Sequence, residues 1–456
     1  MARLRGRLKL RPSRSAANGA GPPQPESSGS SRSAAASTER SLFSGRRRRQ
    51  IVAAVGAQGI QAAASFALQI YAVRSLGVAD YGAFTVLISL LIVLSAFQAG
   101  LRDGGIVLSD DDPGMGPTLA TAQWIGALIA GAIGMIAVAV LDILDAAGAL
   151  LFGLMVVLWV LEEAVRRALM SAMRFDKVAI NDLVYAVFSV GGAIMLTGSG
   201  AMEGLNAFVA AMALGAFVSV AFGLVVQVSA SVLKPARPDP IRLRRLGSFA
   251  VWRSWQGLVR PLSVFATRVG VGAISGDVAL GRLEAGRLLV APFAVVANGL
   301  GTFLLPHFLR QRHLSGSAWR RAVLMPAFVL LVFGALGGAV LVALAQPLSD
   351  MLTGGASAPT AVIAGWVTYT VLDGSSTPLG VAAISLGHTR RVASARTIGA
   401  VIGTVLALVL ATQNVWLVPW ALCVGIVIGT ILLAKVALSG QSVLEGRSPR
   451  AAEPMQ

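Results

Sequence analysis

The sequence predicts an all-α integral membrane protein with about twelve transmembrane helices, forming two six-helix lobes with both termini in the cytoplasm. Three observations predict this fold class. The 456 residues are 55% hydrophobic and only 13% charged, and repeated apolar runs reach ~20 residues, the length that a bilayer core requires. Basic residues fall almost entirely in alternate gaps between these runs, and short motifs recur in the same order in the two halves.

The basic residues are distributed very unevenly between the two sets of alternate gaps. From residue 46 onward, one set of gaps carries 25 Lys and Arg residues, whereas the other set carries only 3, namely Arg74, Arg282 and Arg287. Because positive charge is retained on the cytoplasmic side of a membrane, the richer set is expected to be cytoplasmic. The net charge of +17 thus reflects cytoplasmic loops and a basic tail. It favours contact with anionic membrane lipids and does not predict nucleic-acid binding.

The apolar runs define the expected elements. The expected spans are 51–73, 82–101, 118–141, 148–170, 180–198, 205–232, 249–272, 287–308, 320–345, 359–386, 393–411 and 415–436. The domain organisation that follows is a disordered basic tail (1–45), an N-terminal lobe (46–233), a basic cytoplasmic linker (234–248), a C-terminal lobe (249–437) and a cytoplasmic tail (438–456). The run Arg46 to Arg49 is interpreted as flanking charge of the first span rather than a twin-arginine signal.

Two motif pairs relate the halves. Arg74-Ser-Leu-Gly77-Val-Ala-Asp-Tyr81-Gly82 follows the first span, and Ala273-Ile-Ser-Gly276-Asp-Val-Ala-Leu280-Gly281 follows the seventh, at an offset of 199 residues. The segments 171–179 and 385–393 follow the fourth and tenth spans at an offset of 214. Two pairs of similar segments in the same order indicate an internal duplication with parallel repeats, a layout found in transporters.

The seventh span contains the clearest candidate site. Arg253, Gln256, Arg260, Ser263 and Thr267 fall within about 80° on a helical wheel at ~100° per residue. A charge within a span is costly unless it faces a cavity or a partner, and guanidinium groups bind phosphate through paired hydrogen bonds. We therefore expect a cationic stripe in a water-filled cavity. The alternative is an arginine paired with a carboxylate or carbonyl for packing.

Other polar groups extend this candidate site. Arg268 is expected nearer the outer face, where it could bind substrate or snorkel to the interface. At the offset of 199, Gln61 corresponds to Arg260 and Gln69 to Arg268. Together with Gln58, these glutamines form a polar face on the first span and suggest a second cavity wall. Interhelical hydrogen bonding explains each single glutamine equally well.

The tenth span contains Asp373-Gly374-Ser-Ser-Thr-Pro378 near its middle. This composition predicts a broken helix with freed carbonyls, and Asp373 is the candidate for coupling to a proton or cation, or for pairing with Arg260. Glu162 and Glu163 precede Arg166 and Arg167 by four residues, so structural ion pairs are expected there. The acidic run 110–112 is expected to be a solvated loop.

Missing features exclude several classes of protein. The sequence has no P-loop, no metal-ligating histidine spacing and no nucleophile–base pair, so we expect neither a cofactor, a metal site nor an enzyme. The single cysteine, Cys423, excludes an intramolecular disulfide and a cysteine-based metal cage. A membrane-bound glycan polymerase, ligase or acyltransferase would need a catalytic outer loop, and the outer connections are all short. A non-enzymatic scaffold with a docking tail is the remaining alternative to a transporter.

The segments 74–82, 170–179 and 379–391 resemble the corresponding loops of bacterial polysaccharide flippases of the Wzx type. Those flippases belong, with MATE transporters, to the multidrug/oligosaccharidyl-lipid/polysaccharide exporter superfamily. The resemblance covers roughly residues 46–440 and implies a MATE-like pair of lobes around a cationic cavity in a bacterial inner membrane. It implies alternating access for a polyprenyl-pyrophosphate-linked oligosaccharide, with Arg260 and Arg268 at the positions of cavity arginines.

The resemblance also implies a place in cell-surface polysaccharide biosynthesis, with membrane lipids and a glycan polymerase or assembly machinery as partners. The runner-up function is a MATE-like, cation-coupled multidrug antiporter. Such an antiporter would need a carboxylate-rich cavity, for which only Asp373 is a candidate in the sequence.

Overall fold

The computed structural model describes residues 56–109, 112, 115–227, 233–235, 237, 239–293, 304, 307–311, 314, 316–356 and 358–439. The regular structure assigned in these ranges is helical, as the composition predicts. The expected tail at residues 1–45 lies outside the described residues, as do residues 440–456.

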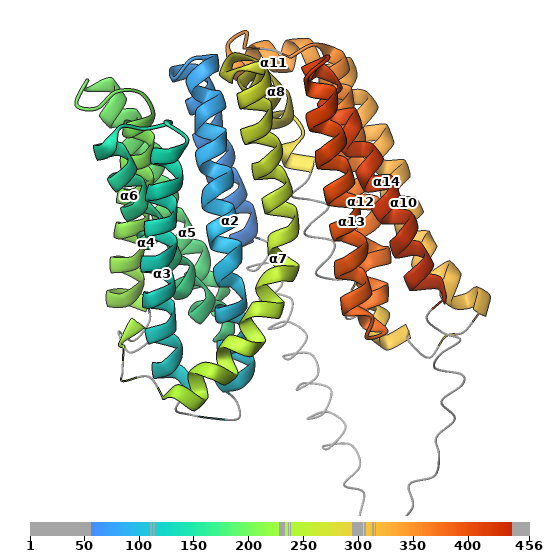
Figure 1. Cartoon of the computed structure of the whole chain (residues 1–456), viewed down its shortest axis with the longest axis horizontal. Helices are drawn as coiled ribbons and strands as arrows, with labels where there is room; N and C mark the ends of the chain where they lie inside the picture. Colours follow the sequence, from blue (N-terminus) through green and yellow to red (C-terminus); the bar gives the residue numbers. More distant parts are fainter. Residues whose placement is uncertain are drawn as a thin grey trace, which may run out of the picture. The chain divides into compact units, whose positions relative to one another are not determined.

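The helices of the first half follow one another through short turns (Figure 1). Residues 56–75 are helical. They are followed by α2 (Val78–Ser109), α3 (Met115–Val140), α4 (Ala146–Ser171), α5 (Phe175–Gly198) and α6 (Gly204–Phe222), which ends in a π-helical turn (Gly223–Gln227).

The second half begins with α7, whose 36 residues make it the longest of the described helices. Its helices are α7 (Pro240–Ser275), α8 (Asp277–Leu288), α10 (Gly316–Ala343), α11 (Ala345–Thr353), α12 (Thr360–Ser385), α13 (Thr389–Ala411) and α14 (Val418–Ser439). A short 3-10 turn (Val415–Leu417) precedes α14.

Nine helices in the described part of the chain are long and apolar enough to cross a membrane: α2 to α6 (with its π-helical turn), α7, α10, α13 and α14 (with its 3-10 turn). The chain is therefore a multi-pass membrane protein. The first and eighth expected spans, 51–73 and 287–308, fall partly outside the described residues. The tenth expected span corresponds to α12, which is 26 residues long. Its central Asp-Gly-Ser-Ser-Thr run makes it more polar than the apolar stretches of these nine helices. The total of twelve spans stays a prediction.

Several element boundaries differ from the expected ones. Helix α7 starts at Pro240, because Asp239 accepts a hydrogen bond from the backbone of Ile241 and proline is well suited to a first turn. Residues 240–248 of the expected linker are therefore helical. Helix α8 starts at Asp277, one residue after α7, so Arg282 and Arg287 lie in a helix and not in a loop. Helix α12 is continuous through Pro378, so the expected helix break is wrong.

The continuity of α12 has a local explanation. Proline removes one backbone donor, and neighbouring hydroxyls can then bond to nearby carbonyls. The hydroxyls of Ser375 and Ser376 donate to the carbonyls of Leu372 and Asp373 at 2.9 and 2.7 Å. The hydroxyl-rich run that suggested a broken helix thus adds hydrogen bonds within an unbroken one.

The turns α4–α5 and α12–α13 have the same backbone structure, which supports the internal duplication. Each helix ends at a serine, Ser171 or Ser385, and the next begins four residues later. Met173 and Gly387, which correspond at the offset of 214, both have positive φ, 57° and 83°. The hydrogen bonds correspond as well: the backbone amides of residues 172–174 and 386–388 donate to carbonyls at equivalent positions.

The helices group by half. Helices α3 to α6 pack on one another, as do α10, α12, α13 and α14, while α2 packs extensively on both α7 and α8 (Figure 1). Helix α7 also contacts α13, through a 2.6 Å hydrogen bond between the hydroxyls of Ser263 and Thr404. Helices α2, α7 and α8 therefore join the two halves.

The first motif pair lies where α2 and α8 cross. Gly77 and Gly276 have φ of 79° and 81°, and each precedes the first residue of its helix. One turn later, Gly82 faces the backbone of Asp277, and Gly281 faces the backbone of Val78. Since 78 and 277 correspond at the same offset as 82 and 281, the contact is symmetric. This contact lies at the end of the molecule that is away from most of the basic residues. We call this end the arginine-poor end.

A second contact joins the halves at the arginine-poor end. Arg74, at the end of the first helical segment, donates hydrogen bonds to the carbonyls of Met351 and Leu352, the latter at 3.1 Å. Those carbonyls belong to the last turn of α11 and lack partners within the helix. The arginine caps that helix end, where a positive charge is favoured.

Candidate functional site

A cavity of about 280 Å³ lies among α7, α12, α13 and α14. Gln256, Arg260 and Ser263 line it from α7, one turn apart, as the helical stripe in the sequence predicts. The lining from the other helices includes the polar residues Tyr369, Asp373, Ser376, Thr377, Arg396 and Thr430. Glycines of α13 and α14 form much of the remaining wall, so backbone approaches the cavity closely.

Arg260 and Asp373 form an ion pair in this cavity, with Nη1 and Oδ2 2.8 Å apart. The side chain of Arg260 is 51% exposed and that of Asp373 is 23% exposed, so the pair faces open volume. Tyr369 of α12 lines the same cavity and is a close neighbour of Arg260. The structure thus brings together the arginine and the carboxylate that the sequence suggested as partners, from helices more than 100 residues apart in the chain.

Arg396 is a second cation in the cavity and was not identified as a site residue from the sequence. It makes no ion pair within the described part of the chain, and it lies close enough to Asp373 and Arg260 to interact with both charges. Its guanidinium packs on Gly380 of α12, where an added Cβ would be 2.8 Å from Nη2. Arg396 lies inside the expected span 393–411, and this position in a span was the signal that could have identified it.

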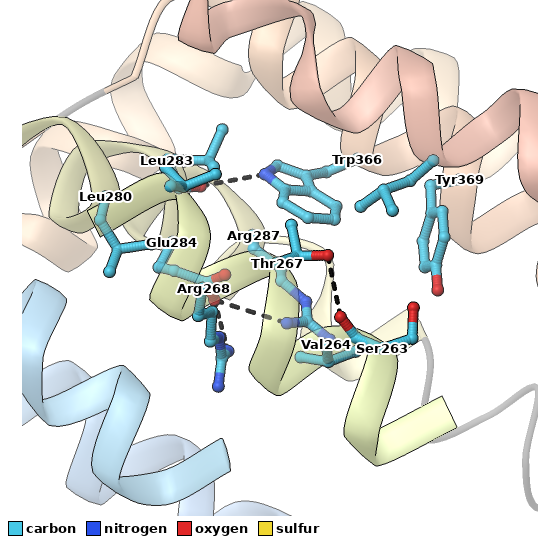
Figure 2. Close-up of a pocket in the computed structure, with 12 residues that line it drawn as sticks. Ser263, Val264, Thr267, Arg268, Leu280, Leu283, Glu284, Arg287, Trp366 and Tyr369 are labelled. Atoms are coloured by element: carbon cyan, nitrogen blue, oxygen red, sulfur yellow. Dashed lines mark hydrogen bonds and ion pairs between the residues drawn. The ribbon is translucent and has the colours of Figure 1, made fainter. Parts of the chain in front are cut away.

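Arg268 lines a second, smaller cavity, which shares Ser263 and Tyr369 with the lining of the first (Figure 2). Its Nη2 is 2.5 Å from Glu284 Oε2, and its Nη1 donates to the carbonyl of Thr85 at 2.7 Å. The two side chains of this pair are only 9% and 5% exposed. Arg268 therefore does not snorkel towards the interface, one of the two roles considered from the sequence, and its charge is neutralised inside the protein. Its role in substrate binding stays a prediction.

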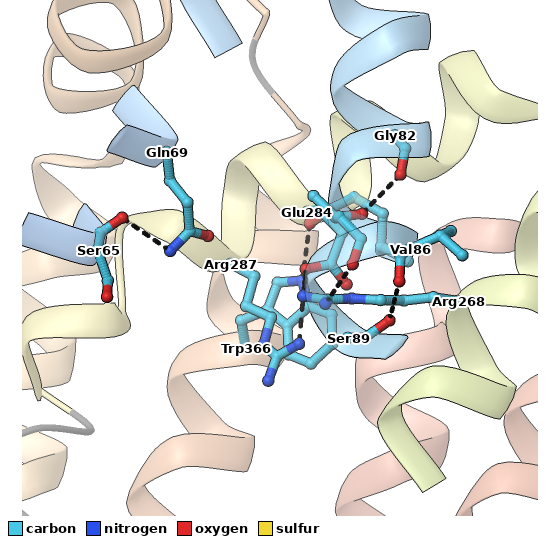
Figure 3. A network of polar contacts seen from close by, with 11 residues as sticks. Ser65, Gln69, Gly82, Val86, Ser89, Arg268, Glu284, Arg287 and Trp366 are labelled. Carbon is cyan, nitrogen blue, oxygen red and sulfur yellow. Dashed lines mark hydrogen bonds and ion pairs between the residues drawn. The ribbon is translucent and has the colours of Figure 1, made fainter. Parts of the chain in front are cut away.

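Arg287 completes this second cluster, which surrounds a cavity of about 20 Å³. Its Nη1 is 3.5 Å from Glu284 Oε2, and its guanidinium lies 5.2 Å from the centre of the Trp366 ring (Figure 3). Trp366 in turn donates its indole hydrogen to the carbonyl of Leu283 at 3.0 Å. A space of this size holds about one water molecule, and the cluster joins α7, α8 and α12 around it.

The remaining predicted site residues lie elsewhere. Arg253 is exposed and lines neither cavity. Gln58 is also exposed, and Gln61 is half-buried. Gln69 donates to the carbonyl of Ser65 in its own helix at 3.2 Å (Figure 3). The three glutamines are absent from the lining of the 280 Å³ cavity, so the second wall that the sequence suggested stays a prediction.

The acidic residues of α4 form a buried network with α5 and α6. Arg166 pairs with Asp182 at 2.9 Å, and Glu163 lies 3.9 Å from both Arg166 and Arg167. Glu162 accepts hydrogen bonds from Asn181 and Ser219 instead of pairing with Arg166 as expected. Among the residues the structure describes, no group of three or more His, Cys, Asp or Glu side chains is arranged to hold a metal ion.

One residue of the acidic run is described. Asp112 receives two hydrogen bonds from Arg242, at 2.7 and 3.1 Å. The hydrogen bonds and the charge of Asp112 raise the pKa of Arg242 above its ordinary value, because both favour the charged guanidinium. This contact fixes the start of α7 to the α2–α3 connection.

Comparison with known proteins identifies the fold. No protein-family model matches the chain, and no curated protein matches its sequence. Solved structures do match. An inward-facing multidrug resistance MATE family transporter of the MOP superfamily has a TM-score of 0.63 and 16% identity over 85% of this chain and 96% of its own. An outward-facing structure of such a transporter has a TM-score of 0.60, again with 16% identity, over 88% and 97%.

A third similar structure is a MOP superfamily transporter from Pyrococcus furiosus, with a TM-score of 0.60 and 14% identity over 87% of this chain and 95% of that one. Its reverse polarity of the binding pocket is described as suggesting a different function for that protein. The present chain therefore has the MATE-like fold of MOP superfamily transporters, a fold that has been solved in both inward- and outward-facing conformations.

Proposed function

We propose that this protein is a flippase that translocates a polyprenyl-pyrophosphate-linked oligosaccharide across a bacterial inner membrane. The observation that carries the proposal is the charge of the larger cavity. Arg260 and Arg396 face it, and among the described residues that line it Asp373 is the one carboxylate. Two guanidinium groups against one carboxylate suit a diphosphate, since each guanidinium binds phosphate oxygens through charge-assisted hydrogen bonds.

The position of the cavity supports the same function. It lies among membrane-spanning helices, so a bound diphosphate would sit between the leaflets while a polyprenyl chain remains in lipid. Exchange between inward- and outward-facing conformations, as in the structures that share this fold, would then carry the headgroup across. The proposal retains the expected partners: the lipid-linked oligosaccharide, membrane lipids and a glycan polymerase or assembly machinery.

The cation-coupled multidrug antiporter is less well supported by this cavity. A cationic drug would meet two arginines, whose repulsion outweighs the single carboxylate already paired with Arg260. The two functions make different predictions about deletion strains: loss of the antiporter would sensitise cells to cationic compounds, whereas loss of the flippase would stop glycan export.

The test is complementation of a deletion strain with wild type, Arg260→Gln, Arg396→Gln or the control Arg282→Gln at matched membrane levels. Arg282 is exposed on α8 and lines neither cavity. We expect wild type and the control to restore surface glycan. The two cavity variants should accumulate lipid-linked oligosaccharide in the inner leaflet, because each lost ionic hydrogen bond costs about 1.5–3 kcal/mol, or roughly 10- to 150-fold in affinity. Unchanged surface glycan and lipid-linked intermediates after deletion would refute the proposal.

A further inference from the structure

The two arginine–carboxylate pairs of the second half differ in their surroundings. In the Arg268–Glu284 pair both side chains are almost fully buried, and Arg268 also binds a backbone carbonyl. The Arg260–Asp373 pair faces a cavity of about 280 Å³, and half of the Arg260 side chain is exposed. A buried pair serves packing, because separating it leaves a charge without a partner. A pair that faces open volume can exchange one partner for a ligand.

Asp373 is held in place by its helix. Helix α12 is continuous at this point, and the carbonyl of Asp373 accepts a hydrogen bond from the hydroxyl of Ser376 at 2.7 Å. The carboxylate is therefore tethered within reach of Arg260 and acts at a high effective concentration. A free ligand that offers a single carboxylate or a weakly charged group competes poorly with it for the same guanidinium.

A diphosphate has an advantage in this competition. It can engage Arg260 and Arg396 together, since both guanidinium groups line the same cavity and Arg396 has no other ion pair in the described residues. Two charge-assisted contacts replace one, and the second arginine contributes only when the ligand is long enough to reach it. A monophosphate or carboxylate gains fewer contacts and still has to displace Asp373.

We infer that Asp373 is a specificity-determining residue: a built-in counter-anion that occupies Arg260 in the empty site and that only a diphosphate-bearing ligand displaces efficiently. This inference rests on the proposed function, and it names how the same site distinguishes ligands. It assigns Asp373 a role different from the ion coupling expected from the sequence. Displacing the carboxylate costs every anion the same free energy, and only a diphosphate gains enough contacts to bind well in spite of this cost.

The experiment measures binding to the purified full-length protein in lipid nanodiscs by isothermal titration calorimetry. The probes are inorganic pyrophosphate, inorganic phosphate and acetate, and farnesyl diphosphate distinguishes a lipid-borne diphosphate from the free anion. The variants are Asp373→Asn, Arg260→Gln and the control Asp80→Asn, whose carboxylate is exposed in the first turn of α2. Thermal unfolding of each variant verifies that it is folded.

We expect Asp373→Asn to bind pyrophosphate and phosphate each about tenfold more tightly than wild type, so that binding of phosphate, undetectable in wild type, becomes measurable. Arg260→Gln should lose affinity for both anions, and the control should match wild type. Tighter binding of farnesyl diphosphate than of pyrophosphate indicates the lipid-borne source, and equal binding indicates the free anion.

The outcomes separate the inference from the proposed function. If wild type binds pyrophosphate but Asp373→Asn binds pyrophosphate and phosphate no more tightly than wild type, the inference is overturned and the proposed function stands. If neither wild type nor Asp373→Asn binds any diphosphate, both are overturned.

Discussion

The contact between Gly82 and Gly281 leads to a prediction about conformational change. At the arginine-poor end, the first turns of α2 and α8 approach so closely that neither glycine has room for a methyl group. An added Cβ at Gly82 would be 3.1 Å from the amide nitrogen of Gly281, and one at Gly281 would be 2.8 Å from the carbonyl carbon of Val78. Non-bonded carbon atoms prefer separations of about 3.5–4.0 Å. Because the obstacles are backbone atoms, the helices themselves have to separate.

The cost of each alanine follows from this overlap. Overpacking of a well-packed contact typically costs about 1–3 kcal/mol. If the contact exists only when the arginine-poor end is closed, the same free energy shifts the balance between closed and open conformations by roughly 5- to 150-fold. Gly82→Ala and Gly281→Ala should therefore both favour opening of this end. Since they act at one contact, the double variant should fall short of the sum of the two effects.

The assay is a spin-label distance measurement across the contact. Labels at cysteines introduced for Asp80 on α2 and Val278 on α8, both exposed, report the separation of the helices after the single native Cys423 is replaced by serine. Wild type should show a short-distance population that both alanine variants deplete. Gly191→Ala is the matched control, because this helical glycine has no atom within 4 Å of an added Cβ. Unchanged distance distributions in both variants would refute the reasoning.

Three further predictions concern single side chains. Glu284→Gln leaves Arg268 buried without a counter-ion and should destabilise the protein by about 3–5 kcal/mol, seen as a lower Tm in detergent, whereas a Tm within error of wild type would contradict this account. Gly380→Ala displaces the flexible end of Arg396 and should lower pyrophosphate affinity several-fold with a stability change below ~1 kcal/mol; unaltered affinity would show that this glycine does not position the guanidinium. Trp319→Phe removes a 3.0 Å hydrogen bond to a carbonyl of α14 and should cost about 1 kcal/mol by thermal unfolding, and no loss of stability would indicate that solvent replaces the bond.

Much of the fold was accessible from the sequence because a bilayer imposes a simple requirement on helices. Apolar runs, interrupted by basic gaps, placed most described spans within a few residues of their observed bounds. Helix α8 was not among the expected elements because its turns are polar. Arg282, Glu284 and Arg287 resemble a loop in composition, yet Glu284 and Arg287 are held in α8 by pairing within the protein. Hydropathy records solvation cost and contains no information about a partner elsewhere in the chain.

The candidate site was only partly predictable for the same reason. The spacing of Gln256, Arg260 and Ser263 on one helix face indicated a cavity, because that pattern depends only on helix geometry. Whether an arginine is open to ligand or closed by a neighbour depends on tertiary structure. Arg260 and Arg268 look alike in the sequence, but one faces open volume and the other is neutralised by Glu284.

The reciprocal contact of α2 and α8 has an evolutionary consequence. In a homodimer of a single six-helix ancestor, one glycine and its partner residue would have formed both halves of this contact. Every mutation would therefore have changed both halves at once. Fusion of two copies into one gene frees each half to change alone. The present chain shows such divergence, since the first half has Gln61 at the position that corresponds to Arg260 in the second half. A cavity with its arginines in one half only is an arrangement that no symmetric homodimer can have.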